Sequence, residues 1–241
     1  MNHKRILSIA ITIVFLTQLP LNAQESKNSY LTSFKGAFDP PMRDKPLATQ
    51  GGASRGEQCI SVASDSKAII SPILPAPSQR LTVVSHPTFL AHFPKTSAKK
   101  VFLRIKDHSE EYDYTTELPI TGQGGIISVT LPPDAPALET GQTYQWLLAV
   151  ICEDQLRPDS PMVQGSVKRV STTITSSEPI KAMTQLQQAA MYAEEGIWYE
   201  TISILAQLRE EQPEDSNLFL IWEKLLTSVG LESLAQAELV D

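Results

Sequence analysis

The residues most suggestive of chemistry lie at 51–56, where Ser54 stands between two glycines in a Gly-x-Ser-x-Gly spacing. That spacing is typical of the sharp turn that exposes the nucleophile of many serine hydrolases. Such a turn needs a buried strand before it and a helix after it, whereas here a polar, proline-containing stretch precedes the loop and a short β-like run follows it. The flanks therefore favour a candidate anion-binding or interaction loop at Ser54 and Arg55.

A triad would also need a histidine and an acid beside the serine. Beyond the N-terminal segment the histidines are His86, His92 and His108, and no local motif places any of them near Ser54. His86 and His92 could share a strand face, but Pro87 between them interrupts regular pairing. The sequence thus predicts no catalytic, metal or cofactor site, and a serine hydrolase at Ser54 stays as the second alternative function.

The first 23 residues have the pattern of a secretory signal peptide. Lys4 and Arg5 precede an apolar run of about a dozen residues, and a polar, proline-containing region ends at Ala23. The run is shorter than the about 20 apolar residues that span a bilayer. We therefore expect cleavage after Ala23, no membrane span afterwards, and a periplasmic or extracellular location.

The charge is acidic and uneven. The chain has 20 Lys and Arg against 27 Asp and Glu, and the segment from Glu178 onward holds 12 acidic and 3 basic residues. An acidic surface without a basic stripe argues against nucleic acid as a partner. The acidic segment is either an interface or a solvated helical face.

Two cysteines, Cys59 and Cys152, are the whole cysteine content. In an oxidising compartment an even pair is most simply a disulfide. Two separate buried thiols, or a redox or metal pair, are the alternatives left open.

Between about Cys59 and Thr173 the chain has short runs rich in β-branched and aromatic residues, separated by proline and glycine. The alternation of Val101, Leu103 and Ile105 is the clearest strand signal. The predicted strands are Leu81–Ser85, Thr88–Phe93, Lys100–Asp107, Glu111–Leu118, Gly125–Leu131, Thr143–Cys152 and Met162–Thr172. Their number and spacing predict an antiparallel, immunoglobulin-like β-sandwich.

After Ser176 and Ser177, either of which could cap a helix, apolar residues recur at helical spacing. Three helices are expected, the second ending before Pro213 and the third at Gly230. Gly196 and Gly230 lie 34 residues apart, each after a helix, which resembles a tetratricopeptide repeat. The overall fold class is therefore α+β, with a tetratricopeptide-like helical tail packed on the sandwich.

One face of these helices carries Trp198, Tyr199 and Trp222. We interpret this stripe as the face that packs on the sandwich, with an open peptide groove as the alternative. The expected organisation is a signal peptide at 1–23, a flexible leader at 24–50, the sandwich at 51–175 and the helical segment at 176–241.

Several stretches in order resemble a family of secreted cyanobacterial proteins, the domain of unknown function numbered 928. They are Gly51–Gly56 with Cys59, Pro87-Thr88-Phe89 with Pro94, Leu131-Pro132, Tyr144-x-Trp146 leading to Cys152, residues 192–199, Leu208-Arg209 with Pro213, and residues 225–231 with Trp222. The family more often has an aromatic where His92 stands and Asp-Ala where Glu200-Thr201 stand. It has no established activity, so the resemblance implies secretion and this fold but no site residue.

These observations favour a non-enzymatic module, periplasmic or secreted, that binds another protein. An envelope polysaccharide-binding module is the first alternative, and its candidate aromatic residues are Tyr112 and Tyr114 if their face is outward.

Overall fold

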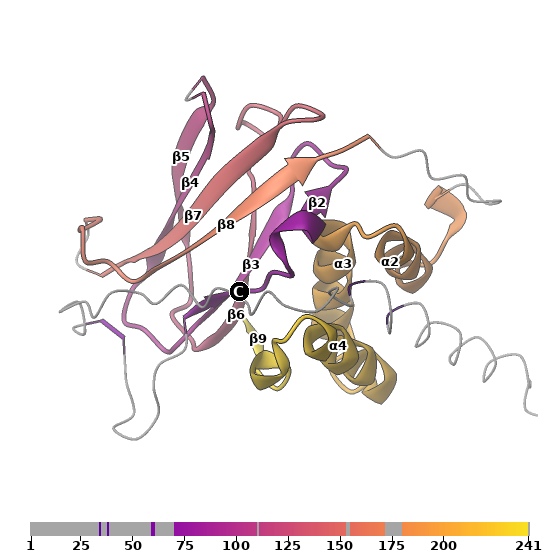
Figure 1. Cartoon of the computed structure of the whole chain (residues 1–241). Helices are drawn as coiled ribbons and strands as arrows, with labels where there is room; N and C mark the ends of the chain where they lie inside the picture. The colour runs from indigo at the N-terminus through magenta and orange to yellow at the C-terminus, as the bar shows by residue number, and fades with distance from the viewer. Residues whose placement is uncertain are drawn as a thin grey trace, which may run out of the picture.

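A computed structural model describes residues 34, 38, 59–60, 70–109, 111–152, 155–171 and 180–240 of the chain, and Figure 1 gives the course of the backbone. The predicted strands are present, and β3 and β4 have the predicted bounds. The strands are β1 (Ser71–Pro72), β2 (Leu81–Thr82), β3 (Thr88–Phe93), β4 (Lys100–Asp107), β5 (Asp113–Pro119), β6 (Gly125–Thr130), β7 (Thr143–Ile151), β8 (Met162–Arg169) and β9 (Leu239–Val240).

The strands form two sheets, one of five strands in the order β2-β8-β7-β4-β5 and one of four in the order β1-β3-β6-β9. The prediction of purely antiparallel pairing is wrong at two places, because β2 pairs parallel to β8 and β9 pairs parallel to β6. Both exceptions are two-residue edge strands reached by long connections. No tight hairpin fixes their direction, so the sheets are mixed.

The two sheets pack face to face around one hydrophobic core. Val101, Leu103 and Ile105 of β4 are fully buried, while Lys100 before them and Arg104 among them are exposed, as period-two alternation predicts. Between the sheets, Phe89 of β3 and Trp146 of β7 lie with ring centroids 5.1 Å apart. The chain is therefore α+β, with a β core of two packed mixed sheets and helices at its C-terminal end.

The helices are α2 (Gln185–Glu194), α3 (Trp198–Glu211) and α4 (Ser216–Ser228), with short 3-10 turns η1 (Pro77–Gln79), η2 (Ile180–Ala182) and η3 (Glu232–Leu234). The first helix begins later than predicted. Its N-cap is Thr184, whose hydroxyl accepts from the Gln187 backbone N–H while the Gln187 side chain accepts from the Thr184 N–H. This reciprocal pair satisfies two donors that no helical carbonyl can reach, which fixes the start at Gln185. Ser176 and Ser177 lie outside the described residues.

The two glycines spaced by 34 residues occupy equivalent turns. Gly196 has φ 70° and Gly230 has φ 77°, and both end a helix with the left-handed residue that glycine tolerates. The residue after each glycine donates to the carbonyl five positions earlier: Ile197 to Tyr192 at 2.9 Å, and Leu231 to Leu226 at 2.8 Å. After the second turn, however, the chain continues as η3 and β9 rather than as a fourth helix, so the resemblance to a tetratricopeptide repeat is not confirmed.

Two residues of the expected leader are part of the core. Phe34 and Phe38 are fully buried, and the Phe38 ring meets Trp198 edge-on at 5.0 Å. Burying an aromatic side chain stabilises a fold by roughly 1.5–3 kcal/mol. Phe38 is therefore anchored on α3 and Phe34 belongs to the same core, although the sequence around them has no apolar periodicity.

The predicted disulfide joins Cys59 to Cys152, with the Cα atoms 5.4 Å apart. Cys152 follows the last residue of β7, so the bond ties the segment before β1 to the end of a central strand. Among the described residues there is no free cysteine.

Candidate interaction surface

Ser54 and Arg55 lie outside the described residues, so their loop stays a prediction. The histidines occupy ordinary structural positions. His86 Nδ1 lies 3.0 Å from the Ser85 hydroxyl and its Nε2 lies 3.0 Å from the Ala135 carbonyl oxygen, so both ring nitrogens are engaged. His92 is half-buried on β3, and His108 lies in the turn after β4.

The aromatic stripe on the helices is interior. Trp198 and Trp222 are fully buried and Tyr199 is 2% exposed. The Tyr199 hydroxyl accepts from the Trp146 indole N–H at 2.9 Å and donates to the Ser166 carbonyl at 2.7 Å. Burial raises the pKa of Tyr199, so this hydroxyl stays protonated and holds α3 against β7 and β8. Trp198 and Tyr199 thus hold α3 on the β core, whereas the Trp222 ring of α4 lies 5.1 Å from the Arg209 guanidinium of α3.

Sequence reasoning missed Glu200 as a structural residue. It is 6% exposed, and its Oε1 accepts from the Thr82 hydroxyl at 2.6 Å and from the backbone N–H groups of Val83 and Val84 at 2.9 and 3.1 Å. The second oxygen, Oε2, is buried without a hydrogen-bond partner. Desolvation raises the pKa of Glu200, and the hydrogen bonds from Thr82, Val83 and Val84 oppose that rise. The carboxyl group clamps α3 to β2, and no signal in the sequence around it indicates this partner.

The two tyrosines considered for saccharide binding do not form an outward-facing platform. Tyr112 is half-buried, stacks edge-on against Tyr144 at 4.9 Å and donates its hydroxyl hydrogen to the Pro136 carbonyl at 2.6 Å. Burial, and then the charges of Tyr144 and Tyr114, raise its pKa to about 12. Tyr114 is half-buried on β5 and packs against the core.

The outer face of the five-stranded sheet carries an apolar strip, which we define as Phe102, Leu147, Ala149 and Met162. Phe102 points away from the core because its neighbours on β4 point inward. Cross-strand pairing places Ala149 between Phe102 and Met162, and Leu147 is the next residue on that face of β7. Met162 is 38% exposed, Phe102 and Leu147 are half-buried, and Ala149 between them is buried. The strip is contiguous along the pairing and reaches solvent chiefly at Met162.

Ion pairs border the apolar strip on the side of β5. Lys100 Nζ lies 3.0 Å from Glu117 Oε2, and Arg104 Nη2 lies 2.6 Å from Asp113 Oδ2. The hydrogen bond from Arg104 lowers the pKa of Asp113. These exposed pairs contribute little stability, since surface salt bridges are worth roughly 0–1 kcal/mol. They do give the face a charged border.

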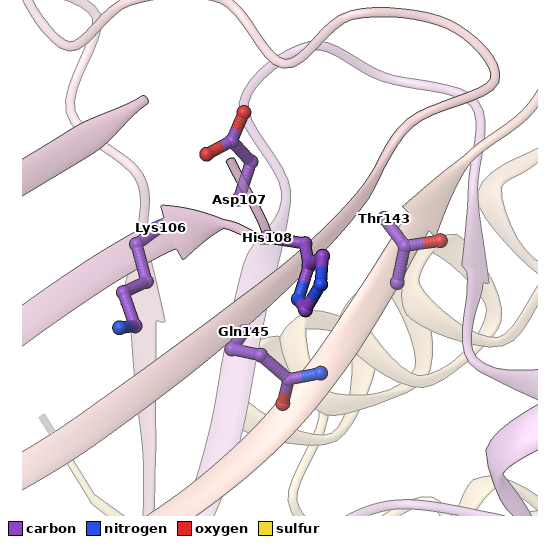
Figure 2. A pocket seen from close by; sticks show the side chains of 5 residues that line it. All are labelled: Lys106, Asp107, His108, Thr143 and Gln145. Carbon is purple, nitrogen blue, oxygen red and sulfur yellow. The ribbon is translucent and has the colours of Figure 1, made fainter. Parts of the chain in front are cut away.

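A polar pocket of about 490 Å³ opens at the end of the same face. Figure 2 shows its lining, which comes from β4 and the turn after it and from the start of β7; the residues are Lys106, Asp107, His108, Thr143 and Gln145. The Asp107 carboxylate accepts from the Ser109 hydroxyl at 2.7 Å and from the Tyr112 N–H at 3.3 Å, which fixes the turn.

The helices lie on the other side of the molecule. In Figure 1, α3 and α4 stand beside β3, β6 and β9, away from β4 and β5. Within the described ranges, α3 packs on β2, β3 and β9, while α2 and α4 pack on α3. Among the described elements, no helix lies on the outer face of the five-stranded sheet (Figure 1).

Two kinds of feature are absent from the described residues. No cluster of three or more His, Cys, Asp or Glu side chains there could hold a metal ion. No helix in that part of the chain has the length and apolar character needed to cross a membrane.

Comparison with known proteins gives a family and a distant structural likeness. The fn3 domain of the human collagen alpha-1(XX) chain is similar at 18% identity over 49% of this chain and 97% of that one, with a TM-score of 0.28, which is too low to support an argument. No curated protein matches the chain. The profile of the family described as Domain of Unknown Function (DUF928) matches residues 50–239, which is most of the chain, and the chain belongs to that family.

Proposed function

We propose that this protein is an exported, non-enzymatic module that binds another protein through the outer face of its five-stranded sheet. The observation that carries the proposal is the apolar strip, which reaches solvent at Met162 and is bordered by the Lys100 and Arg104 ion pairs. An apolar centre with a charged border is the usual anatomy of a protein interface. Contiguous exposed apolar surface on a folded domain commonly marks such a site.

Export is part of the proposal. It is supported by the Cys59–Cys152 disulfide, because disulfides persist mainly in oxidising compartments. The signal-like pattern of residues 1–23 supports it from the sequence. The cyanobacterial origin implied by the family resemblance makes the periplasm or the medium the expected location.

Position-specific crosslinking tests the function. A photoreactive amino acid replaces Gln164, an exposed residue of β8 on the sheet face, and in the control it replaces Leu220, which is 37% exposed on α4. In an extract of the cell envelope, we expect a discrete crosslinked protein from position 164 and not from position 220. The change Met162→Asp should abolish it, whereas Leu220→Asp should not. The same products from both positions would contradict the proposal.

The polysaccharide alternative keeps one supporting observation, the polar pocket beside His108. Its lining offers hydrogen-bonding groups for sugar hydroxyls but no exposed aromatic ring. A polysaccharide array probed with wild type, with a His108→Ala/Gln145→Ala double variant and with a Tyr112→Ala/Tyr114→Ala double variant would identify such binding. The Ser54 hydrolase alternative predicts fluorophosphonate labelling that the Ser54→Ala variant loses.

A further inference from the structure

The outer edge of β5 is suited to receive another strand. This strand ends the five-stranded sheet, and Figure 1 shows it at the rim of the molecule. Its pairing with β4 is continuous from Asp113 to Pro119, without a bulge. Among the described strands, none pairs with its other side. An edge strand of this length presents backbone groups that can template pairing with a further chain.

The register decides which backbone groups face outward. The Asp107 N–H donates to the Tyr112 carbonyl and the Ile120 N–H donates to the Lys99 carbonyl, both at 3.0 Å. Bonded residues alternate along an antiparallel strand, so Tyr114, Thr116 and Leu118 also direct their backbone groups toward β4. The residues between them, Asp113, Thr115 and Glu117, direct an N–H and a C=O away from the sheet.

The side chains along this edge differ between the two faces of the sheet. On the outer face Asp113, Thr115 and Glu117 are exposed. On the inner face Tyr114 and Leu118 are half-buried and pack against the core, so a further strand would cover what remains exposed of them. An incoming strand that alternates basic and apolar residues matches both faces.

Charge supports this choice of partner. On the outer face the charge changes sign from strand to strand, with Lys100 and Arg104 on β4 and their acidic partners on β5. A Lys or Arg on the next strand would stand directly opposite Asp113 or Glu117, at roughly 4.5–5.5 Å between Cβ atoms, and continue the alternation. If a second copy of β5 paired antiparallel with the two Thr115 residues opposite each other, Asp113 would stand opposite Glu117 of the copy. Two like charges would then face each other, which is unfavourable.

We propose that β5 is a strand-addition site, and that its ligand is an extended, basic segment of a partner protein with Lys or Arg alternating with apolar residues. The inference rests on the proposed binding function and specifies the partner's chemistry and the mode of recognition. Backbone hydrogen bonds to Asp113, Thr115 and Glu117 supply the attachment, and the alternating side chains supply the selectivity.

A synthetic peptide tests the proposal with the intact protein. The probe is acetyl-Thr-Lys-Val-Thr-Val-Lys-Thr-amide, fluorescently labelled and titrated with protein. In antiparallel pairing, its first lysine can face Glu117, its central threonine can face Thr115, and its second lysine can face Asp113. N-methylation of the central threonine removes a donor from the bonded edge and should weaken binding about tenfold or more, because about 1.4 kcal/mol corresponds to a factor of ten. N-methylation of the first valine, whose N–H faces away, should change affinity less than about threefold.

Variants of the protein complete the test. Thr115→Pro removes an outward N–H without removing a bond to β4, so it should abolish peptide binding, while Thr115→Val should preserve it. Asp113→Lys/Glu117→Lys keeps the backbone edge and should reverse the selectivity toward a peptide with Glu in place of Lys. Equal binding of both N-methylated peptides, or no binding of any peptide by the wild type, would overturn strand addition. Crosslinking from Gln164 would still decide the proposed function separately. Self-association that Thr115→Pro abolishes would assign the edge to a second copy and overturn the basic partner.

Discussion

Replacing Glu200 tests how the helical segment is held on the sheets. In Glu200→Ala, the Thr82 hydroxyl loses its acceptor in a buried position and the Val83 N–H loses its acceptor in a half-buried one. Val84 retains a weaker partner, the Thr82 hydroxyl oxygen at 3.3 Å. A buried donor left without a partner costs roughly 1–3 kcal/mol. Only the Thr82 hydroxyl is fully buried, and removing a buried charge offsets part of the cost, so we expect a loss of about 1–3 kcal/mol in the free energy of unfolding.

Glu200→Gln is the matched control. The amide keeps an acceptor at the position of Oε1 and removes the charge, and Oε2, which becomes the NH₂ group, has no partner to lose. We expect its stability to lie within about 1 kcal/mol of wild type, because the weaker neutral hydrogen bonds are offset by the smaller desolvation cost.

The difference in stability between Glu200→Gln and wild type should also depend on pH, and the sign of that dependence can be worked out. Desolvation raises the pKa of Glu200 above its ordinary value of 4.5, so the folded state binds the proton more tightly than the unfolded state. The stability contributed by the protonated group is fully present below pH 4.5 and is lost as the pH rises through the higher folded pKa. Relative to wild type, Glu200→Gln should therefore become more stable as the pH increases from 4.

Urea unfolding at several pH values between 4 and 8 measures both effects. The reasoning fails if Glu200→Ala costs less than about 1 kcal/mol, because the buried donors would then have found other acceptors. It also fails if the difference between Glu200→Gln and wild type is the same at every pH.

Three further changes probe the same framework. Cys59→Ser/Cys152→Ser should cost at most about 4–5 kcal/mol, because the disulfide spans 93 residues; urea unfolding that is unaffected by a reductant in wild type would speak against this. Tyr199→Phe strands the buried indole N–H of Trp146 and should cost about 1–3 kcal/mol; a thermal midpoint equal to that of wild type would exclude the role assigned to the hydroxyl. Gly196→Ala should cost about 1–2 kcal/mol through backbone strain alone, since φ is 70° and no heavy atom lies within 4 Å of the added Cβ; unchanged thermal unfolding would show that the turn relaxes freely.

The sequence predicts only part of the candidate surface. The sequence predicts that β5 exists and that Tyr114 and Leu118 share one of its faces. It does not indicate that this face is the inner one, or that β5 lies at the edge of the sheet. Edge position depends on which strands the chain places on either side, and that is settled by long-range pairing.

The sequence by itself determined the local elements, because their signals lie within a few residues. Alternating apolar residues define β4, and Gly196 and Gly230 end helices at equivalent turns. The disulfide could also be predicted, since two cysteines in a chain expected to be exported have one obvious pairing.

The tertiary structure alone decided the features that join distant residues. Glu200 meets Thr82 across 118 positions, and Trp198 donates to the Ile73 carbonyl across 125. Phe38, in a stretch without periodicity, is buried against Trp198. A pattern in sequence reports the environment of neighbouring residues, whereas a buried carboxyl group finds its donors only after the sheets and helices have packed. The same packing places β5 at the edge of the five-stranded sheet, where no described strand pairs with its outer side.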